Sequence, residues 1–143
     1  MTAGPVRVVF DTNILVSGHF WKGSPYRCLL AVEAGLAVMV LSDPILAELD
    51  EKLTVKFGVS KAEVDSTVKR LRTGAERTHI EGKSGWVPLD PDDDKFIETA
   101  LVGGAGVIVS GDRHLLTLGT VEGIEILTAR QFLDRLAAAA PKV

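Results

Sequence analysis

The chain has 143 residues, of which 46% are hydrophobic and 24% charged. These values predict one folded domain spanning residues 1–143 and argue against a disordered chain. The net charge of -3 excludes a strongly basic nucleic-acid-binding protein as judged by overall charge. Its single cysteine, Cys28, cannot form an internal disulfide, and no apolar run reaches the roughly 18 residues of a membrane span. We therefore expect a cytoplasmic protein with no membrane segment.

Short apolar stretches rich in β-branched residues predict four β-strands: Val6–Phe10, Ala37–Leu41, Val107–Val109 and Ile124–Leu127. Continuous apolar strands of this kind are typical of parallel sheets that are buried on both faces. Helical patterns lie between the strands, so we expect the strands to run in one direction. Their carboxyl ends should then share one edge of the sheet, where ligands bind in open α/β folds.

Helix starts are predicted where a capping residue, an early proline or a capping box precedes a helical pattern: residues 24–25, 43–44, 60–63, 90–91 and 128–131. Glycines predict three helix ends, near Gly35, at Gly74 and at residues 103–104. The second helix carries Ile45, Leu49, Leu53 and Phe57 at a spacing of four, which predicts a buried stripe. Residues 86–89 fit either a short strand or an extended connection. The alternation indicates one doubly wound α/β domain.

Acidic residues follow the predicted strands or begin the helices after them. Asp11 comes directly after the first strand, Glu48 lies in the first turns of the helix after the second strand, and Asp112 follows Ser110 and Gly111 after the third. Taken singly, each has an ordinary structural explanation. Asp11 and Asp112 are suited to forming turns, and Glu48 is suited to pairing with Lys52 four residues later.

A fourth acidic region contains Asp90, Asp92, Asp93 and Asp94 around one helix start. One cap and one or two further acids would complement the helix dipole, but four like charges at neighbouring positions repel one another. All four regions map to the same edge of the sheet, so their carboxylates can converge. Hard oxygen ligands of this kind suit one or two Mg²⁺ or Mn²⁺ ions. The three histidines, His19, His79 and His114, show no zinc-ligand spacing.

These blocks resemble the PIN-domain family, and most closely its branch of toxin components of toxin–antitoxin pairs related to VapC-type ribonucleases. The resemblance covers essentially the whole chain, and the blocks occur in the family's order. The matching segments are residues 9–18 (VFDTNILVSG), 42–49 (SDPILAEL), 90–97 (DPDDDKFI) with Ala100, 110–116 (SGDRHLL), and 124–128 (IEILT) with residues 132–133.

The resemblance implies a three-layer α/β/α domain with a mostly parallel central sheet, and hydrolysis of RNA that depends on Mg²⁺ or Mn²⁺. The family's catalytic and metal-binding acids fall on Asp11, Glu48, Asp94 and Asp112. Asp92, Asp93 and Asp94 are all alternatives for the third acid, and Asp94 is selected because it precedes the Phe-Ile-x-x-Ala pattern by the family's usual spacing. Supporting polar positions fall on Asn13, Ser110 and Asp92. A homodimer and a small antitoxin protein are the partners that the resemblance implies.

Binding of RNA also requires cations that meet its phosphates. The candidates are Lys69, Arg70 and Arg72, in a locally basic stretch that also fits a solvated helix face, and Arg113 beside a predicted site loop. Two other functions remain open. One is a PIN-like module that binds without catalysis. The other is a phosphatase of the haloacid-dehalogenase type, but that class needs a second aspartate where this chain has Asn13.

Overall fold

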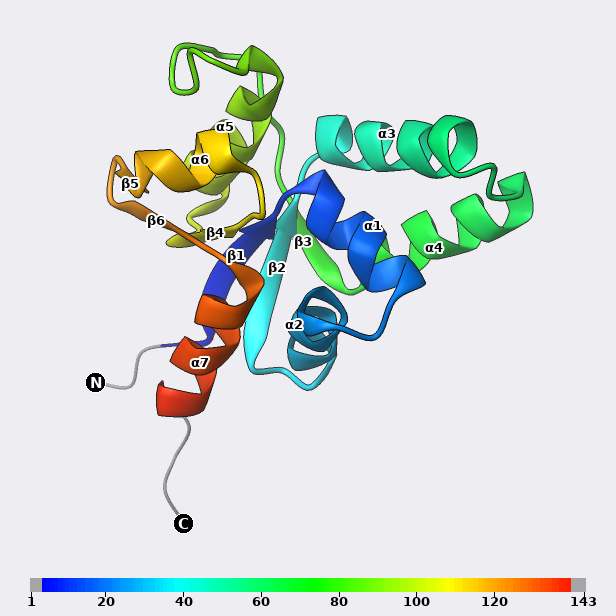
Figure 1. Ribbon diagram of the computed structural model, residues 1–143, viewed down its shortest axis with the longest axis horizontal. Helices are drawn as coiled ribbons and strands as arrows, with labels where there is room; N and C mark the ends of the chain where they lie inside the picture. The colour runs from blue at the N-terminus through cyan, green and yellow to red at the C-terminus, as the bar shows by residue number, and fades with distance from the viewer. Residues whose placement is uncertain (1–3, 140–143) are drawn as a thin grey trace.

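A central six-stranded sheet organises the computed structural model, which describes residues 4–139 (Figure 1). The strand order is β3-β2-β1-β4-β6-β5, and only β5 runs antiparallel to its neighbour. The strands are β1 Val6–Phe10, β2 Ala37–Leu41, β3 Ala75–Arg77, β4 Val107–Val109, β5 Thr120–Val121 and β6 Ile124–Leu127. The predicted mostly parallel sheet is therefore confirmed, with all four predicted strands at their predicted bounds.

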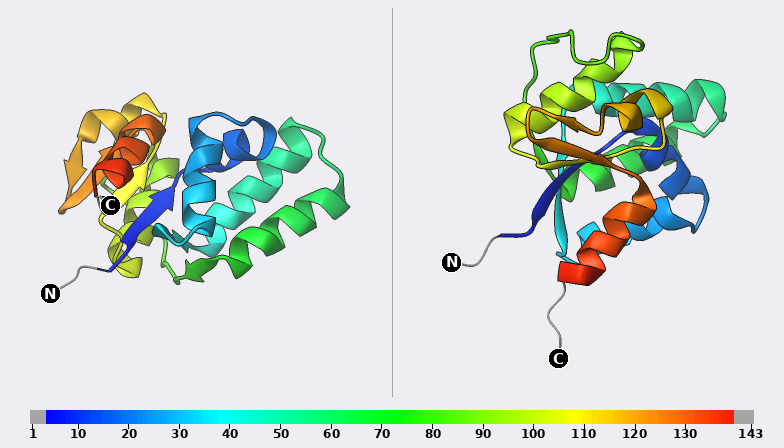
Figure 2. Two further views of the ribbon diagram at one scale, coloured as in Figure 1. Left: turned by 90° about the horizontal axis from the view of Figure 1, so that it is seen from below. Right: turned by 60° about the vertical axis from the view of Figure 1, so that its left-hand side comes forward.

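Seven α-helices surround the sheet within the described residues: α1 Thr12–Phe20, α2 Ser24–Glu33, α3 Asp43–Glu51, α4 Lys61–Thr73, α5 Asp94–Gly103, α6 Arg113–Leu118 and α7 Ala129–Ala139. A π-helical turn, Lys52–Lys56, continues α3, and a 3₁₀ turn, Pro91–Asp93, leads into α5. Helices α2 and α7 pack together against β2 and β6, whereas α5 crosses β1, β2 and β4 (Figure 1 and Figure 2). Right-handed crossovers put these two groups on opposite faces, which gives the three α/β/α layers.

The predicted helix boundaries follow local capping chemistry. Ser60 Oγ accepts a hydrogen bond from the Glu63 backbone N–H at 3.2 Å, and the Thr128–Gln131 capping box forms in both directions at 3.1 and 2.9 Å. Helix α5 is terminated by its C-cap residue Gly104, whose φ of 69° lies in the left-handed region that glycine adopts without strain. The capping residues were thus reliable guides to where helices begin and end.

Helix α5 lies very close to the sheet because its last residue has no side chain. A Cβ atom at Gly103 would lie 2.4 Å from Cγ1 of Val40 on β2, a distance that non-bonded carbons do not tolerate. Phe96, Ile97 and Ala100 of α5 are also buried in the core, and Phe96 and Ala100 share the helix face of Gly103. This tight packing fixes the position of the acidic start of α5 relative to the sheet.

Several elements were not predicted. Helices α1 and α6 and the short edge strands β3 and β5 have no counterpart in the sequence prediction. Residues 86–89 form a turn rather than a strand. Phe57, predicted to end the buried stripe of α3, is 40% exposed and lies just after the π-helical turn, where the helix has ended, whereas Leu53 within the turn is fully buried.

The order of the strands creates a switch point between β1 and β4. The chain leaves β1 toward β2 on one side and leaves β4 toward β6 on the other. In open α/β sheets, ligands bind outside the carboxyl ends of the strands at such a point. None of the helices in residues 4–139 has the length and apolar character needed to cross a membrane. The extreme ends of the predicted 1–143 domain lie outside the described residues.

Candidate functional site

Asp11 occupies the centre of the carboxyl edge, at the switch point between β1 and β4. Its backbone N–H donates to the Val109 carbonyl at 3.0 Å, so the two strands remain paired up to this residue. The side chain is only 3% exposed. Its Oδ1 accepts a hydrogen bond from the Ile14 N–H at 2.8 Å and caps α1, and its Oδ2 accepts one from the Ser110 hydroxyl. Both oxygens are thereby fixed in orientation.

Ser110 connects Asp11 with Asp112. It is fully buried after β4, and its Oγ accepts the Asp112 backbone N–H at 2.9 Å while donating to Asp11. Asp112 caps the short helix α6 through the His114 N–H at 2.7 Å. One hydroxyl therefore positions two acidic residues that are 101 positions apart in the sequence. The structure brings the predicted residues Asp11, Ser110 and Asp112 together.

The acidic run before α5 contributes Asp93 to this cluster. The neighbouring charges of Asp90, Asp112 and Asp11 act on its half-buried carboxylate. Its Oδ2 is buried and has no hydrogen-bond partner among residues 4–139. Asp90 lies close by, and one ligand atom each from Asp90, Asp112 and His114 lie within 4.8 Å of one another. An unpaired carboxylate oxygen surrounded by other acids is the environment that a cation would stabilise.

Asp94, predicted as the fourth acid of the site, has a different position. Its two oxygens accept the backbone N–H groups of Gly85, Trp86 and Val87 at 3.2, 3.0 and 2.8 Å. The side chain is 4% exposed and holds the loop that precedes α5. The structure therefore places the Asp94 carboxylate against this loop, where three backbone N–H groups occupy its oxygens, and its role as an ion ligand stays a prediction. The neighbouring Asp93 has the position that was expected of Asp94.

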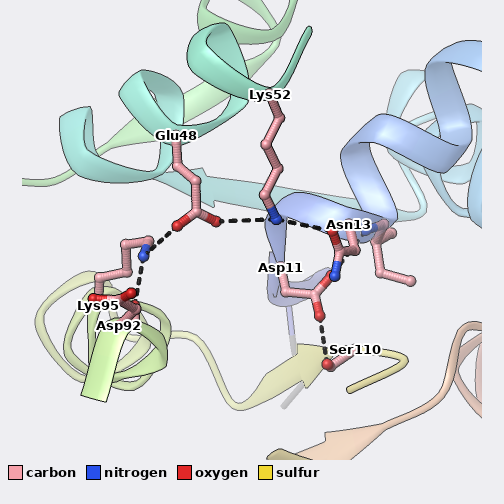
Figure 3. A network of polar contacts seen from close by, with 8 residues as sticks. Asp11, Asn13, Glu48, Lys52, Asp92, Lys95 and Ser110 are labelled. Carbon is pink, nitrogen blue, oxygen red and sulfur yellow. Dashed lines mark hydrogen bonds and ion pairs between the residues drawn. The ribbon is translucent and has the colours of Figure 1, made fainter. Parts of the chain in front are cut away.

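Glu48 reaches the site from α3 but is held by two lysines (Figure 3). Lys95 Nζ lies 2.6 Å from Glu48 Oε2, and Lys52 Nζ lies 3.8 Å from Oε1. Lys52 also donates to Asn13 Oδ1 at 2.9 Å. The predicted Glu48–Lys52 pair is present, but it is the longer of the two contacts. Glu48 and Asn13 thus belong to one charged network beside Asp11.

The predicted supporting residue Asp92 contributes through its backbone. Its side chain is exposed, while its carbonyl oxygen accepts a hydrogen bond from Lys95 Nζ. This contact helps to keep the Lys95 ammonium beside Glu48 (Figure 3). The Asp92 side chain itself takes no part in the contacts of the acidic cluster.

The protonation of these acids reflects their surroundings. Burial raises the pKa of Asp11, against the effect of the hydrogen bonds from Ser110 and Ile14. Burial and the negative charges of Asp90 and Asp112 raise the pKa of Asp93 to about 8. Burial also acts to raise the pKa of Glu48, but the hydrogen bond and charge of Lys95, helped by Lys52, hold it below its ordinary value. Crowded carboxylates and two lysines therefore share one site.

The predicted RNA-binding cations are divided between two parts of the molecule. Lys69, Arg70 and Arg72 lie in the last turns of α4, which leads directly into the amino end of β3. The acids lie at the opposite, carboxyl edge of the parallel sheet. Arg113 alone is beside the site, as the first residue of α6 after Asp112. A hollow next to the cluster adds another cation, since its lining includes Arg130 with Asn13 and Asp112.

Lys95 and Asp93 are the main site residues that the sequence analysis did not single out. Lys95 lies within the matching segment 90–97, but the sequence analysis assigned it no role, and its 2.6 Å distance from Glu48 identifies it. Asp93 was one of several acids in a row, among which the family's usual spacing selected Asp94. His114 was expected at the surface, and its side chain is 44% exposed even though it lies near Asp90 and Asp112.

A divalent cation fits the donor set of this cluster. The carboxylates of Asp11, Asp93 and Asp112 are hard oxygen donors, and the buried Asp93 Oδ2 lacks a partner in the described structure. Ser110 donates to the Asp11 carboxylate, the kind of hydrogen bond that typically orients a metal-binding carboxylate, and it also accepts the Asp112 backbone N–H. The arrangement has the composition of a site for Mg²⁺ or Mn²⁺.

Comparison with known protein families gives one match, to a family described as PIN domain, over residues 7–114. The matched segment contains every acid of the cluster. No curated protein matches the chain.

Similar solved structures include PAE2754 from Pyrobaculum aerophilum, with a TM-score of 0.59 and 16% identity over 93% of this chain and 90% of that one. VapBC2 from Rickettsia felis, bound to a DNA fragment from their promoter, has a TM-score of 0.56 and 15% identity over 85% of this chain and 97% of that one. The RRP44 PIN domain of T. brucei has a TM-score of 0.53 and 17% identity over 96% of this chain and 83% of that one. At these identities the three structures establish a shared fold.

Proposed function

The chain belongs to the PIN domain family, and from this premise we propose that it is a ribonuclease that uses Mg²⁺ or Mn²⁺ to hydrolyse RNA phosphodiester bonds. The observation that supports this proposal most strongly is the convergence of Asp11, Asp93 and Asp112 at the switch point of the sheet. Substrates of open α/β folds bind at that edge.

In this proposal Asp11, Asp93 and Asp112 hold the cation, and Glu48 acts as a further ligand or as the base that accepts a proton from the attacking water. A divalent ion bound there supplies positive charge to the scissile phosphate and makes a bound water more acidic. Ser110 donates to the Asp11 carboxylate and accepts the backbone N–H of Asp112, so it holds one carboxylate and the backbone of the other residue in place. Asp94 has a structural role, because it holds the loop before α5.

The substrate would approach over the hollow lined by Asn13, Ser17, Ser110, Gly111, Asp112 and Arg130. Arg130 lines this hollow and Arg113 follows Asp112 directly in the chain, and both guanidinium groups suit contact with phosphate oxygens. Lys69, Arg70 and Arg72 lie at the other edge of the sheet, so they would meet RNA only far from the cleaved bond. The proposed binding residues near the site are therefore the two arginines.

We further propose that the protein is the toxin of a toxin–antitoxin pair, with a small antitoxin as partner and a homodimer as its assembly. This rests on the sequence resemblance to VapC-type toxins and on the likeness of its fold to VapBC2 from Rickettsia felis. Co-purification with the product of a neighbouring short reading frame would support the pairing. An active protein with no such partner would leave a ribonuclease that is not a toxin.

The direct test is incubation of the purified protein with total RNA and Mn²⁺ or Mg²⁺, followed by sequencing of the cleavage ends. We expect discrete cleavage that chelation abolishes. Asp11→Asn should abolish cleavage while the circular dichroism spectrum is unchanged. Equal cleavage by this variant would refute the proposal, and Mn²⁺-dependent RNA binding without cleavage would favour a non-catalytic module. Asn13 has no acidic proton to donate, which leaves the phosphatase alternative unsupported.

A further inference from the structure

Lys95 is a largely buried lysine of the site that forms a short ion pair with Glu48. Its Nζ lies 2.6 Å from Glu48 Oε2, and its side chain is 16% exposed, against 26% for Glu48. The same ammonium donates to the Asp92 carbonyl oxygen. It therefore neutralises the one acid of the network that comes from α3 (Figure 3).

The position of Lys95 is fixed by the fold. It is the second residue of α5, whose packing on the sheet is close, and its Nζ lies 5.1 Å from the centroid of the Phe96 ring. The other lysine, Lys52, is committed to Asn13 at 2.9 Å and reaches Glu48 only at 3.8 Å. Lys95 is thus the principal counter-ion of Glu48.

This pairing conflicts with metal binding at Glu48. Glu48 Oε2 is engaged by the Lys95 ammonium at 2.6 Å, and a divalent ion bound to the same carboxylate would lie close enough to this ammonium for the two cations to repel each other. Once Glu48 moves to an ion, the ammonium loses its strongest partner in a partly buried place. A buried ammonium without a counter-charge is costly, so another anion must replace Glu48.

We propose that Lys95 exchanges partners during the reaction cycle: it neutralises Glu48 in the metal-free protein and binds a non-bridging oxygen of the RNA phosphate once a divalent ion has taken Glu48. The inference rests on the proposed ribonuclease function and names a substrate-binding residue of that site. The exchange gives the Lys95 ammonium a negatively charged partner in the metal-free and in the metal-bound protein. It also makes phosphate binding by Lys95 depend on ion binding by Glu48.

The test compares wild-type protein with Lys95→Met and Lys95→Arg in two binding measurements that require no turnover. Mn²⁺ affinity is measured by isothermal titration calorimetry. RNA affinity is measured at saturating Mn²⁺ by fluorescence anisotropy of a short, uniformly phosphorothioate-substituted single-stranded RNA, whose integrity is checked on a gel. Lys61→Met, at a lysine whose side chain is 88% exposed on α4, controls for the loss of one positive charge. Thermal unfolding verifies that each variant is folded.

Lys95→Met should bind Mn²⁺ about tenfold more tightly, since the competitor for Glu48 is gone. The same variant should bind the RNA about tenfold more weakly. The salt dependence of its RNA affinity should be less steep, by the amount expected for the loss of about one phosphate contact. Lys95→Arg and Lys61→Met should stay close to wild type in both measurements. Effects of opposite sign on the two ligands are the signature of partner exchange.

Any other pattern for a folded Lys95→Met protein overturns the proposal, including unchanged Mn²⁺ affinity, weakened Mn²⁺ affinity or unaltered RNA binding. Equal changes in Lys61→Met would also overturn it, since they would reflect general charge. The ribonuclease function fails separately: if Lys95→Met shows the two opposite effects but the wild-type protein never cleaves RNA, the exchange is retained and the enzymatic role is lost.

Discussion

Asp93 and Asp94 are neighbours in the sequence, yet their carboxylates serve opposite sides of the helix start. Asp93 faces Asp11 and Asp112 with one oxygen unpaired, whereas Asp94 accepts three backbone N–H groups from residues 85–87. Successive residues of a helix point about 100° apart. A side chain one position further along the chain therefore contacts the loop of residues 85–87 and not the acids of the site. Substitutions at Asp93 and at Asp94 should therefore have opposite effects on stability and on metal binding.

Replacing Asp94 should destabilise the protein. Asp94→Asn removes the negative charge that accepts three N–H groups and places an amide donor near one of them, which should lower the free energy of unfolding by about 2–4 kcal/mol. Urea unfolding monitored by circular dichroism measures this. Asp93→Asn is the matched control and should not be destabilised in metal-free buffer, because it relieves repulsion among the acids. Equal stability of Asp94→Asn and wild type would show that the loop contacts are unimportant.

Glu98 gives a second test of the same loop. It lies one turn after Asp94, is 2% exposed, and accepts the N–H groups of Glu81, Gly82 and Lys83 at 2.9, 3.0 and 2.9 Å. Glu98→Gln should make residues 81–90 more sensitive to limited proteolysis without changing Mn²⁺ affinity. Protection equal to wild type, or a loss of Mn²⁺ binding in a folded protein, would contradict this assignment.

The raised pKa of Asp93 predicts how stability depends on pH. Because its pKa is about 8 in the folded protein and 3.8 ordinarily, the folded state binds more protons than the unfolded state between these values. Stability of the metal-free protein should therefore be highest at the acidic end of this window and fall as pH rises through it, levelling above about pH 8. Asp93→Asn should remove this part of the dependence.

Comparison of urea midpoints for wild type and Asp93→Asn across this pH range provides the measurement. The difference between the two proteins isolates Asp93 from the other titrating groups. A constant difference at every pH would contradict the raised pKa. Apparent Mn²⁺ affinity should rise with pH over the same window, since the ion must displace the proton from Asp93.

Ser110 is expected to matter for the ion without contacting it. Ser110→Ala removes the hydrogen bonds to Asp11 and Asp112 and should weaken Mn²⁺ binding about tenfold, as loss of a residue supporting the ligands typically does. Thr117→Ala on the neighbouring helix α6 deletes a hydroxyl that bonds only the Arg113 carbonyl and serves as control. Titration calorimetry measures the Mn²⁺ affinity of both variants. Equal Mn²⁺ affinities of Ser110→Ala and Thr117→Ala would exclude a positioning role for Ser110.

The sequence predicted the strands well because each is a buried apolar run with its own boundaries. It missed α1 because this helix is buried on most sides: Ile14, Leu15, Val16 and Gly18 are all inside, so no polar face marks a helical period. Strands β3 and β5 are three and two residues long and lie toward the edges of the sheet. Short, polar segments of this kind acquire strand geometry only from their neighbours.

Within the site, Asp11, Glu48 and Asp112 were predictable because each is tied to the end of a strand or the beginning of a helix. The choice among Asp92, Asp93 and Asp94 was not, because a 3₁₀ turn at Pro91–Asp93 precedes the α-helix and shifts which residue faces the sheet edge. Lys95 was invisible for another reason. Its role arises from a 2.6 Å contact with Glu48, and the two residues lie 47 positions apart.

The most direct test is the position of the ion itself. Crystals grown with Mn²⁺ and measured near the manganese absorption edge should give an anomalous difference peak bounded by Asp11, Asp93 and Asp112, with Asp94 still holding residues 85–87. A peak lying elsewhere in the molecule, or none in crystals containing saturating Mn²⁺, would contradict a metal centre at the switch point of the sheet.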